Sequence, residues 1–227
     1  MKPVLVFIIL AAAFSLVWLQ HPNAQTSQPR FLITWKTNSF APTGFNGKTL
    51  PTANSIITAS LELIDGGKPA DLSRQTIYWY LNDNLLENKN GVQRVSFLAP
   101  DVAGGTLDLR VQVPNYRGNT LLKTIEIPVA RPEAVIEAPF PNGEFHNSPI
   151  HLMARPYFFN VGQSEDLTFS WKVNGDPPQN SEEPGGLNVV LNKDAPNGAL
   201  VTVDLAIQNP VNIFEGALGS INLTFIK

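Results

Sequence analysis

Apolar and polar residues alternate along most of the chain, and a two-residue period of this kind predicts β-strands. The alternating stretches are short and are separated by turn residues at intervals of roughly 8–12 residues. We expect strands near residues 31–35, 55–64, 75–81, 85–86, 92–98, 106–113 and 121–129, and again near 134–137, 150–154, 167–173, 187–191, 200–207 and 220–226. After the N-terminal segment, the 3.6-residue apolar period of a helix is absent from the sequence. The pattern predicts an all-β sandwich or barrel.

The strand pattern occurs twice. Residues 76–83 (TIYWYLND) and 168–175 (TFSWKVNG) each place a tryptophan inside a strand and an asparagine three residues later. The tryptophans, Trp79 and Trp171, are 92 residues apart, and further matching blocks recur at offsets of 93 to 96. One immunoglobulin-type sandwich has about 100 residues. The repeat therefore predicts two tandem copies of one domain rather than the short units of a solenoid.

The N-terminus has the pattern of an export signal. Lys2 precedes an uncharged, largely apolar run of 16 residues, 4–19, as in a secretory signal. Two interpretations stay open: cleavage after Ala24, or an uncleaved signal anchor, because a full membrane span needs about 20 apolar residues. In both cases the protein is exported, so it is extracellular, on the cell surface or in the periplasm. Contact with a membrane is expected only through this segment, if it is uncleaved.

The repeat and the signal together divide the chain. We expect a signal peptide or signal anchor (1–24), a polar linker (25–29), a first immunoglobulin-like domain (30–130) and a second one (131–227). The boundary is placed at Arg131-Pro132, because proline cannot donate to a β-ladder and stiffens a connection.

Composition narrows the classes of function. Charged residues make up 15% of the chain, below the usual share of about 25%. The net charge is −3 and Lys and Arg form no run, so the sequence does not indicate nucleic-acid binding. The 19 prolines and 16 glycines suit a turn-rich β protein. Cysteine is absent, which excludes disulfides, a cysteine nucleophile and a thiolate metal site.

The tryptophan strand resembles strand C of an immunoglobulin-like domain, in which a tryptophan packs between the two sheets. Asp101 and Gly105 resemble the start of strand F, but Leu107 stands where that family has a tyrosine, and both cysteines of the inter-sheet disulfide are missing. The chain is therefore similar to bacterial immunoglobulin-like, polycystic-kidney-like and fibronectin-III-like modules of exported proteins. This resemblance implies two tandem sandwiches with Trp79 and Trp171 in their cores.

The sequence gives little support for a catalytic site or for a metal site. His146 and His151 lack the spacing of a catalytic triad, and we expect them on a loop and on the outer side of a strand. The segments 82–84 (NDN) and 165–166 (ED) offer oxygen ligands for calcium, but the chain has no D-x-D-x-D-G loop, and Asn and Asp also form turns. We expect no catalytic residue, no bound metal and no cofactor.

Aromatic loop residues are the best candidates for ligand binding. They are Phe40, Phe45, Phe140, Phe145, Tyr157 and Phe158. The first four occupy the connection between the first two strands of each copy. Exposed aromatic side chains bind sugars or partner proteins. The alternative is that they plug the open ends of the sandwiches, and their recurrence in both copies favours this alternative.

These observations favour a non-enzymatic, exported module that acts in cell-surface structure, adhesion or protein binding, with a protein or another cell-surface component as partner. The alternative is a carbohydrate-binding accessory protein of the cell envelope, with a glycan as ligand. The last expected strand, 220–226, is uncharged up to Lys227. If this strand lies at a sheet edge, the edge is poorly protected, and we expect this edge or its neighbour to mediate docking or self-assembly by strand pairing.

Overall fold

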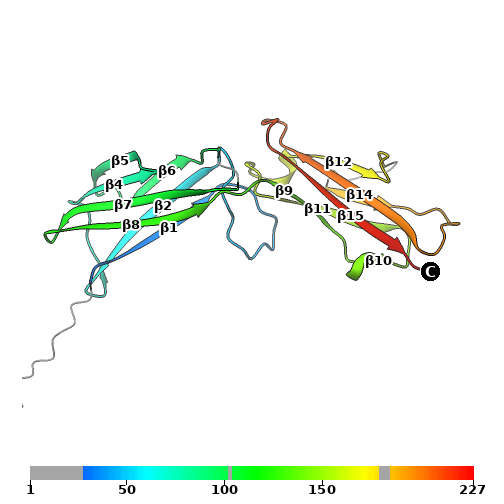
Figure 1. The fold of residues 1–227 in the computed structure, drawn as a ribbon, viewed down its shortest axis with the longest axis horizontal. Coiled ribbons are helices and arrows are strands. Elements are labelled where there is room, and N and C mark those ends of the chain that lie inside the picture. The colour runs from blue at the N-terminus through cyan, green and yellow to red at the C-terminus, as the bar shows by residue number, and fades with distance from the viewer. Residues whose placement is uncertain (1–27, 102–103, 179–184) are drawn as a thin grey trace, which may run out of the picture.

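The computed structural model describes residues 28–101, 104–178 and 185–227, and these form an elongated molecule of two lobes placed end to end (Figure 1). Strands β1 to β8 build one lobe and strands β9 to β15 build the other. The expected export signal and its cleavage site lie outside the described residues. None of the helices in the described ranges is long and apolar enough to cross a membrane.

The first lobe is a sandwich of two antiparallel sheets. One sheet contains β1 (Arg30–Thr37), β2 (Ile56–Asp65), β3 (Lys68–Pro69) and β6 (Arg94–Leu98), with β1, β3 and β6 all paired to β2. The other has the order β5-β4-β7-β8, with β5 at Asn84–Asn90, β4 at Thr76–Leu81, β7 at Thr106–Tyr116 and β8 at Asn119–Pro128. β5 is longer than the expected two-residue strand, because the turn at Asn82 and Asp83 sends the chain back along β4.

The second lobe repeats this arrangement. One sheet has the order β13-β11-β9, with β13 at Gly186–Val189, β11 at Ile150–Tyr157 and β9 at Glu133–Glu137. The other has the order β10-β15-β14-β12, with β10 at Glu144–Phe145, β15 at Gly216–Phe225, β14 at Ala199–Gln208 and β12 at Thr168–Val173. The neighbours β1-β2-β6 and β4-β7-β8 thus recur as β9-β11-β13 and β12-β14-β15. The prediction of an all-β fold with two tandem immunoglobulin-like sandwiches is confirmed.

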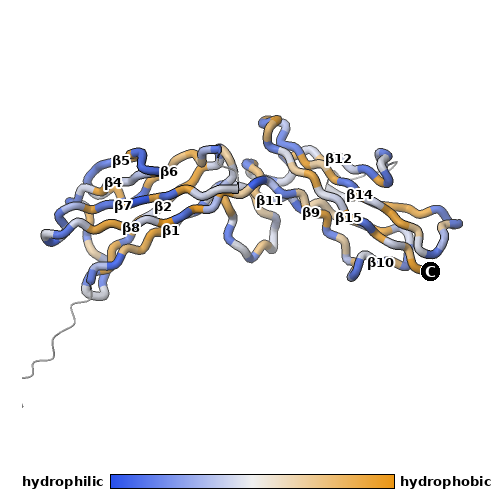
Figure 2. Tube along the Cα trace, in the orientation of Figure 1, coloured by the Kyte–Doolittle hydropathy of each residue, from blue (hydrophilic) through white to orange (hydrophobic). Residues whose placement is uncertain are grey.

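Each sandwich has its own hydrophobic core, built from the inward residues of its strands. Figure 2 shows hydrophobic and hydrophilic positions interspersed along the strands of both sandwiches. Trp79 is fully buried in the first core, and its indole Nε1 donates a hydrogen bond to the Val92 carbonyl at 2.8 Å. Trp171 lies in the second core and is 5% exposed. The two tryptophans therefore occupy equivalent central places between the sheets.

The asparagine that follows each tryptophan has a structural role. The Asn82 backbone N–H donates to the Asp108 carbonyl at 2.9 Å, and the Asn82 side-chain oxygen accepts from the Asp108 N–H at 2.9 Å. Asn174 makes the same two bonds to Thr202, at 2.8 and 2.9 Å. Both asparagines have positive φ angles, 46° and 52°, which this residue type tolerates better than most. The repeated asparagine thus fastens the turn after the tryptophan strand to the neighbouring strand.

The last strand does not have the unprotected edge that the sequence indicated. β14 pairs with one side of β15 along its whole length, and β10 pairs in parallel with its other side at Thr224 and Phe225. Nearer the start of β15, the β9 backbone approaches so closely that a Cβ at Gly219 would lie 2.3 Å from the Ala134 carbonyl oxygen. Because β10 and β9 cover this edge, the expectation of an unprotected edge at 220–226 is wrong, and the edge no longer supports docking or self-assembly by strand pairing.

The burial of Trp79 generates a stability prediction. Replacing Trp79 with alanine removes a large, fully buried side chain and leaves a cavity, so we expect unfolding of the first sandwich to cost about 3–5 kcal/mol less. Urea denaturation followed by far-UV circular dichroism measures this loss. Thr124→Ala, at an exposed position on β8, is the control and should change stability by about 0.5 kcal/mol or less. A wild-type midpoint for Trp79→Ala would contradict the central place assigned to this residue.

The separate cores motivate a second prediction. We propose that the boundary at Arg131-Pro132 divides two units that fold independently, because the two core clusters share no residue. Residues 28–130 and 131–227, produced separately, should each show β-type circular dichroism and a cooperative thermal transition. If neither fragment unfolds cooperatively, the two sandwiches depend on one another and the proposed boundary is incorrect.

Candidate interaction site at the joint between the sandwiches

Residues 38–50, the first part of the connection between β1 and β2, extend from the first sandwich toward the second, and we call them the joint loop (Figure 1). Its turn closes with a hydrogen bond from the Phe45 N–H to the Pro42 carbonyl at 3.1 Å, and Gly44 supplies the positive φ of 89° that this turn needs. Lys48 holds the loop to the first sandwich, with its ammonium 3.4 Å from the centre of the Trp35 ring. Desolvation at this position lowers the pKa of Lys48.

Backbone hydrogen bonds join this loop to the second sandwich. The Phe40 N–H donates to the Phe159 carbonyl at 2.7 Å, and the Phe158 N–H donates to the Phe40 carbonyl at 2.7 Å. Phe158 has a φ of 60°, an uncommon conformation for a bulky residue, which persists only where the surroundings hold it. Its buried ring and its bond to Phe40 provide that restraint. The two sandwiches are therefore connected by a β-like pairing in addition to the chain at Arg131-Pro132.

Aromatic rings pack around this pairing. The Phe45 ring lies edge-on to Tyr157 at 5.5 Å and to Phe158 at 6.0 Å between centroids. Gly47 makes room for this ring, because a Cβ there would lie 2.4 Å from its nearest carbon. Edge-to-face pairs of this kind contribute about 0.5–1.5 kcal/mol each beyond the area they bury. The cluster thus reinforces the joint with side-chain contacts from both sandwiches.

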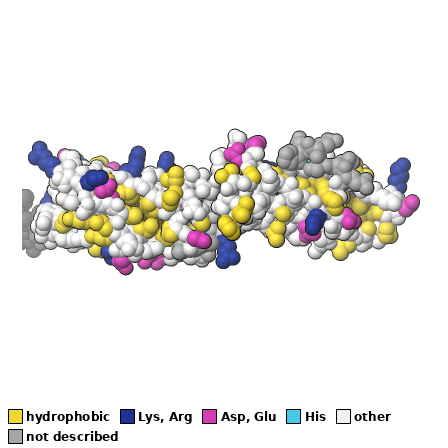
Figure 3. Space-filling model, turned by 90° about the horizontal axis from the view of Figure 1, so that it is seen from above, with side chains coloured by type: hydrophobic (Ala, Val, Ile, Leu, Met, Phe, Trp, Pro, Cys, Tyr) yellow, Lys and Arg dark blue, Asp and Glu magenta, His cyan; other side chains and the backbone are white. Residues whose placement is uncertain are grey.

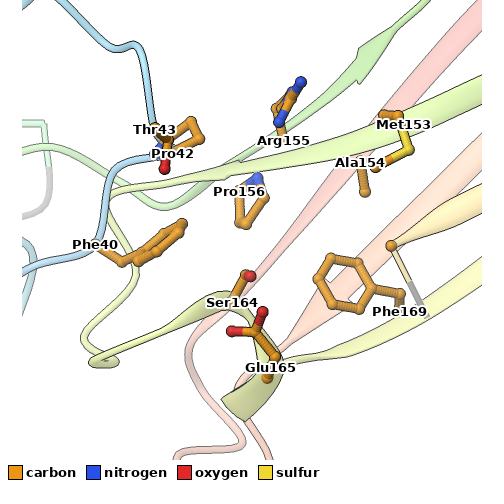
Figure 4. A pocket seen from close by; sticks show the side chains of 11 residues that line it. Phe40, Pro42, Thr43, Met153, Ala154, Arg155, Pro156, Ser164, Glu165 and Phe169 are labelled. Carbon is orange, nitrogen blue, oxygen red and sulfur yellow. The ribbon is translucent and has the colours of Figure 1, made fainter. Parts of the chain in front are cut away.

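A hollow of about 410 Å³ lies beside the joint (Figure 4). Phe40 of the joint loop and Pro156 and Phe169 of the second sandwich contribute its apolar surface. The titratable side chains that line it are Arg155, which forms an ion pair with Glu137, and Glu165. Ser164 and Glu165 lie next to each other in this lining, and no histidine is among the described lining residues (Figure 4).

The connection between β14 and β15 lies at the same end of the second sandwich, next to the joint (Figure 1). It presents three large apolar side chains to solvent, and we call them the apolar tip: Val211 is 93% exposed, Ile213 is 74% exposed and Phe214 is 94% exposed. Figure 3 shows hydrophobic side chains on the surface of both sandwiches, and isolated exposed apolar residues are common. Three within four positions form a local apolar surface, which is typical of interaction sites.

Hydrogen bonds fix the backbone beneath the apolar tip. The Gln208 amide donates to the carbonyls of Asn212 and Glu215 at 3.2 and 3.0 Å. The Asn209 side chain accepts from the Val211 N–H at 3.0 Å and donates to the Glu215 carboxylate at 2.6 Å. Asn209 and Glu215 are both buried. The apolar side chains therefore stand on an ordered frame, and binding through them loses little backbone entropy.

Glu215 also connects this frame to the joint. Its other carboxylate oxygen accepts a hydrogen bond from the Asn160 N–H at 2.6 Å. The Asn160 side chain in turn bonds to two residues of the first sandwich, the Asn38 side chain at 3.4 Å and the Asn54 carbonyl at 3.2 Å. One chain of hydrogen bonds thus runs from the apolar tip through the joint to the first sandwich.

The structure separates the six aromatic candidates into two groups. Phe40, Phe45, Tyr157 and Phe158 come together at the joint. Phe140 and Phe145 lie elsewhere in the second sandwich. Phe145 is 1% exposed and contacts the rings of Phe140 and Phe225 at 5.8 and 5.6 Å, so this pair belongs to the core rather than to an exposed loop.

Sequence reasoning missed the apolar tip. The segment 209–216 (NPVNIFEG) contains three apolar residues among turn-forming ones and does not continue the alternation of β14. That combination indicates an exposed apolar surface, because large apolar residues inside a predicted turn have no core to enter.

The remaining polar candidates have local structural partners. His146 and His151 are exposed, and their Nδ1 atoms lie 3.0 Å from the Ile226 carbonyl and 2.9 Å from the Asn188 side chain. In the 82–84 segment, Asp83 forms an ion pair with Arg110 at 2.6 Å. Across the described ranges, no group of three or more His, Cys, Asp or Glu side chains is placed to hold a metal ion.

No family model matches the chain, and no curated protein matches it. Among solved structures, the fibronectin(III)-like modules of CbhA from Clostridium thermocellum are similar, with 11% identity, a TM-score of 0.30 and coverage of 86% of this chain and 94% of that one. The N-terminal domains of the Hoc capsid protein of bacteriophage RB49 share 14% identity, with a TM-score of 0.44. This alignment covers 87% of the chain and 59% of the phage fragment. The strand order and the two cores, rather than these similarities, define the fold.

The aromatic contacts at the joint should affect its local stability. Phe45→Ala removes the ring contacts to Tyr157 and Phe158, so the backbone pairing beneath them should open more often. Amide hydrogen exchange should therefore accelerate at Phe40 and Phe158, the two donors across the joint, while the core strands keep their protection. Lys36→Ala, an exposed change on β1, is the control. Unchanged exchange at both amides would show that the aromatic cluster does not stabilise the joint.

Proposed function

We propose that this chain is an exported, non-enzymatic protein-binding module of the cell surface, extracellular space or periplasm, and that it contacts its partner through the apolar tip. The observation that carries the proposal is the exposure of Val211, Ile213 and Phe214 on a hydrogen-bonded frame. Leaving apolar surface in water costs about 25 cal/mol per Å², and a partner that covers the tip recovers this free energy. The N-terminal pattern supports export.

The charge around the apolar tip favours a protein partner over a lipid surface. Residues 209–215 contain no Lys or Arg, and their one charged residue is the buried Glu215. Glu165 and Asp166 lie just before Thr168, which pairs with Gln208 at the base of the loop. Anionic membranes attract basic segments and repel acidic ones. The surroundings of the tip therefore suit an apolar pocket with basic groups on its rim.

The size of the apolar tip favours insertion into a preformed pocket. Three side chains bury at most a few hundred Å², whereas a standard interface buries about 1,200–2,000 Å². The tip alone is too small to hold two flat surfaces together. A few well-buried anchors nevertheless carry most of the binding free energy in many interfaces, and aromatic residues are prominent among them.

Substitutions in the apolar tip test this function. Ile213→Ser and Phe214→Ser should each weaken binding of the labelled protein to cell envelopes of its source organism by about tenfold or more, because hot-spot truncations cost about 2 kcal/mol or more. Thermal unfolding should stay at the wild-type temperature, since both side chains point into solvent. Leu200→Ser is the matched control, because Leu200 is an exposed apolar residue of the same sandwich outside the tip.

Treatment of the envelopes separates this function from the alternative of carbohydrate binding. Protease digestion should abolish the tip-dependent binding, and periodate oxidation of glycans should leave it intact. Tip variants that bind as the wild type does would refute the proposed contact. Binding that survives protease and is lost after periodate treatment would instead identify a glycan as the principal ligand.

A further inference from the structure

The sheet β5-β4-β7-β8 of the first sandwich has an outer face with an unusual aromatic pair. Ile77 and Trp79 point into the core and are fully buried, so Tyr78 and Tyr80 point outward from the same strand. Their rings are nearly parallel, at 11°, with centroids 6.3 Å apart. The register with the neighbouring strand shifts between Trp79 and Tyr80, where Leu86 of β5 is the extra residue, while β4 itself continues regularly alongside β7. We call this surface the tyrosine face.

An arginine from the neighbouring strand is held against this pair. The guanidinium carbon of Arg110 on β7 lies 4.5 Å from the centre of the Tyr80 ring. Its Nη1 donates to the Asp83 carboxylate at 2.6 Å. Because the ring and the carboxylate restrain the guanidinium from two sides, Tyr80 and Arg110 form an ordered unit on the sheet surface.

Amide side chains flank the other tyrosine. In the sheet register, Tyr78 lies between Asn88 on β5 and Gln112 on β7, so all three side chains share the outer face. An amide both donates and accepts hydrogen bonds. Leu85 and Leu122, which are 51% and 57% exposed, lie at the borders of the same face. The tyrosine face thus combines flat rings with neutral hydrogen-bonding groups.

We propose that the tyrosine face binds a neutral, β-1,4-linked glycan chain. The sugar rings of such a chain present flat C–H surfaces that pack against Tyr78 and Tyr80, and their hydroxyl or acetamido groups bond to Asn88, Gln112 and Arg110. Mixed apolar and hydrogen-bonding recognition of this kind fixes both the position and the orientation of a ligand. This site lies on the first sandwich and takes a different class of ligand from the apolar tip, so it does not depend on the proposed protein binding.

The charged residues of the tyrosine face favour a neutral glycan over an acidic one. Asp83 neutralises Arg110. Asp108 and Glu126 lie opposite each other in register, and alternation along β7 places Asp108 on the same side as Arg110. The face therefore carries excess negative charge, which repels uronate-containing or phosphorylated polymers.

Native affinity electrophoresis tests the site with defined polymers. The full chain should be retarded in gels containing hydroxyethylcellulose or glycol chitin, and should migrate freely in gels containing polygalacturonate. A Tyr78→Ala, Tyr80→Ala double variant should lose the retardation, with an apparent affinity about tenfold lower for each ring removed. Gln112→Ala tests the hydrogen-bonding part of the site and should also weaken retardation, even if loss of both rings disturbs folding.

Two further variants serve as controls for glycan binding at the tyrosine face. Tyr80→Phe keeps the ring and should stay retarded, which separates ring stacking from hydroxyl bonding. Phe214→Ser alters only the apolar tip and should be retarded like the wild type, so failure of this site and failure of the proposed protein binding are distinguishable. Free migration of the wild type with both neutral polymers would overturn the proposal. Equal retardation of the wild type and of a folded double variant would overturn it too.

Discussion

The backbone pairing between Phe40 and the segment Phe158–Phe159 is the interaction on which the arrangement of the molecule depends. Two hydrogen bonds of 2.7 Å add a short stretch of β-like structure to the chain connection at Arg131-Pro132. They hold Phe158 at a φ of 60°, an uncommon backbone conformation for this residue type. Because the pairing uses the loop between β11 and β12, it leaves the neighbouring loop between β14 and β15 free at the same end of the second sandwich.

Glu215 connects the joint to the apolar tip. Its buried carboxylate accepts hydrogen bonds from Asn160 at the joint and from Asn209 in the frame of the apolar tip. A buried carboxylate needs such partners, since an unpaired one is strongly destabilising. The same two bonds therefore stabilise the charge and orient the tip relative to the first sandwich. The tyrosine face and the apolar tip are thus carried on one connected scaffold, with a different surface chemistry on each sandwich.

The sequence predicted those features that depend on local pattern. The repeated tryptophan strand, its asparagine turn and the two-residue alternation are local, and most of the strands and the buried tryptophans follow from them. It could not predict features that depend on which elements meet in space. Phe40 and Phe145 occupy corresponding loops, yet one pairs with the other sandwich and one enters a core. The edge of the last strand is covered by β10 and β9, and neither contact is visible in its own sequence.

The most direct test of the account places a photoreactive group in the apolar tip. Phe214→p-benzoylphenylalanine, irradiated in intact envelopes of the source organism, should form a covalent adduct with a protein, because we propose that this side chain enters a partner's pocket. The same group at Leu200, also exposed on the second sandwich, should form no such adduct. An adduct of equal yield from both positions, or none from Phe214, would contradict the claim that the tip is the binding surface.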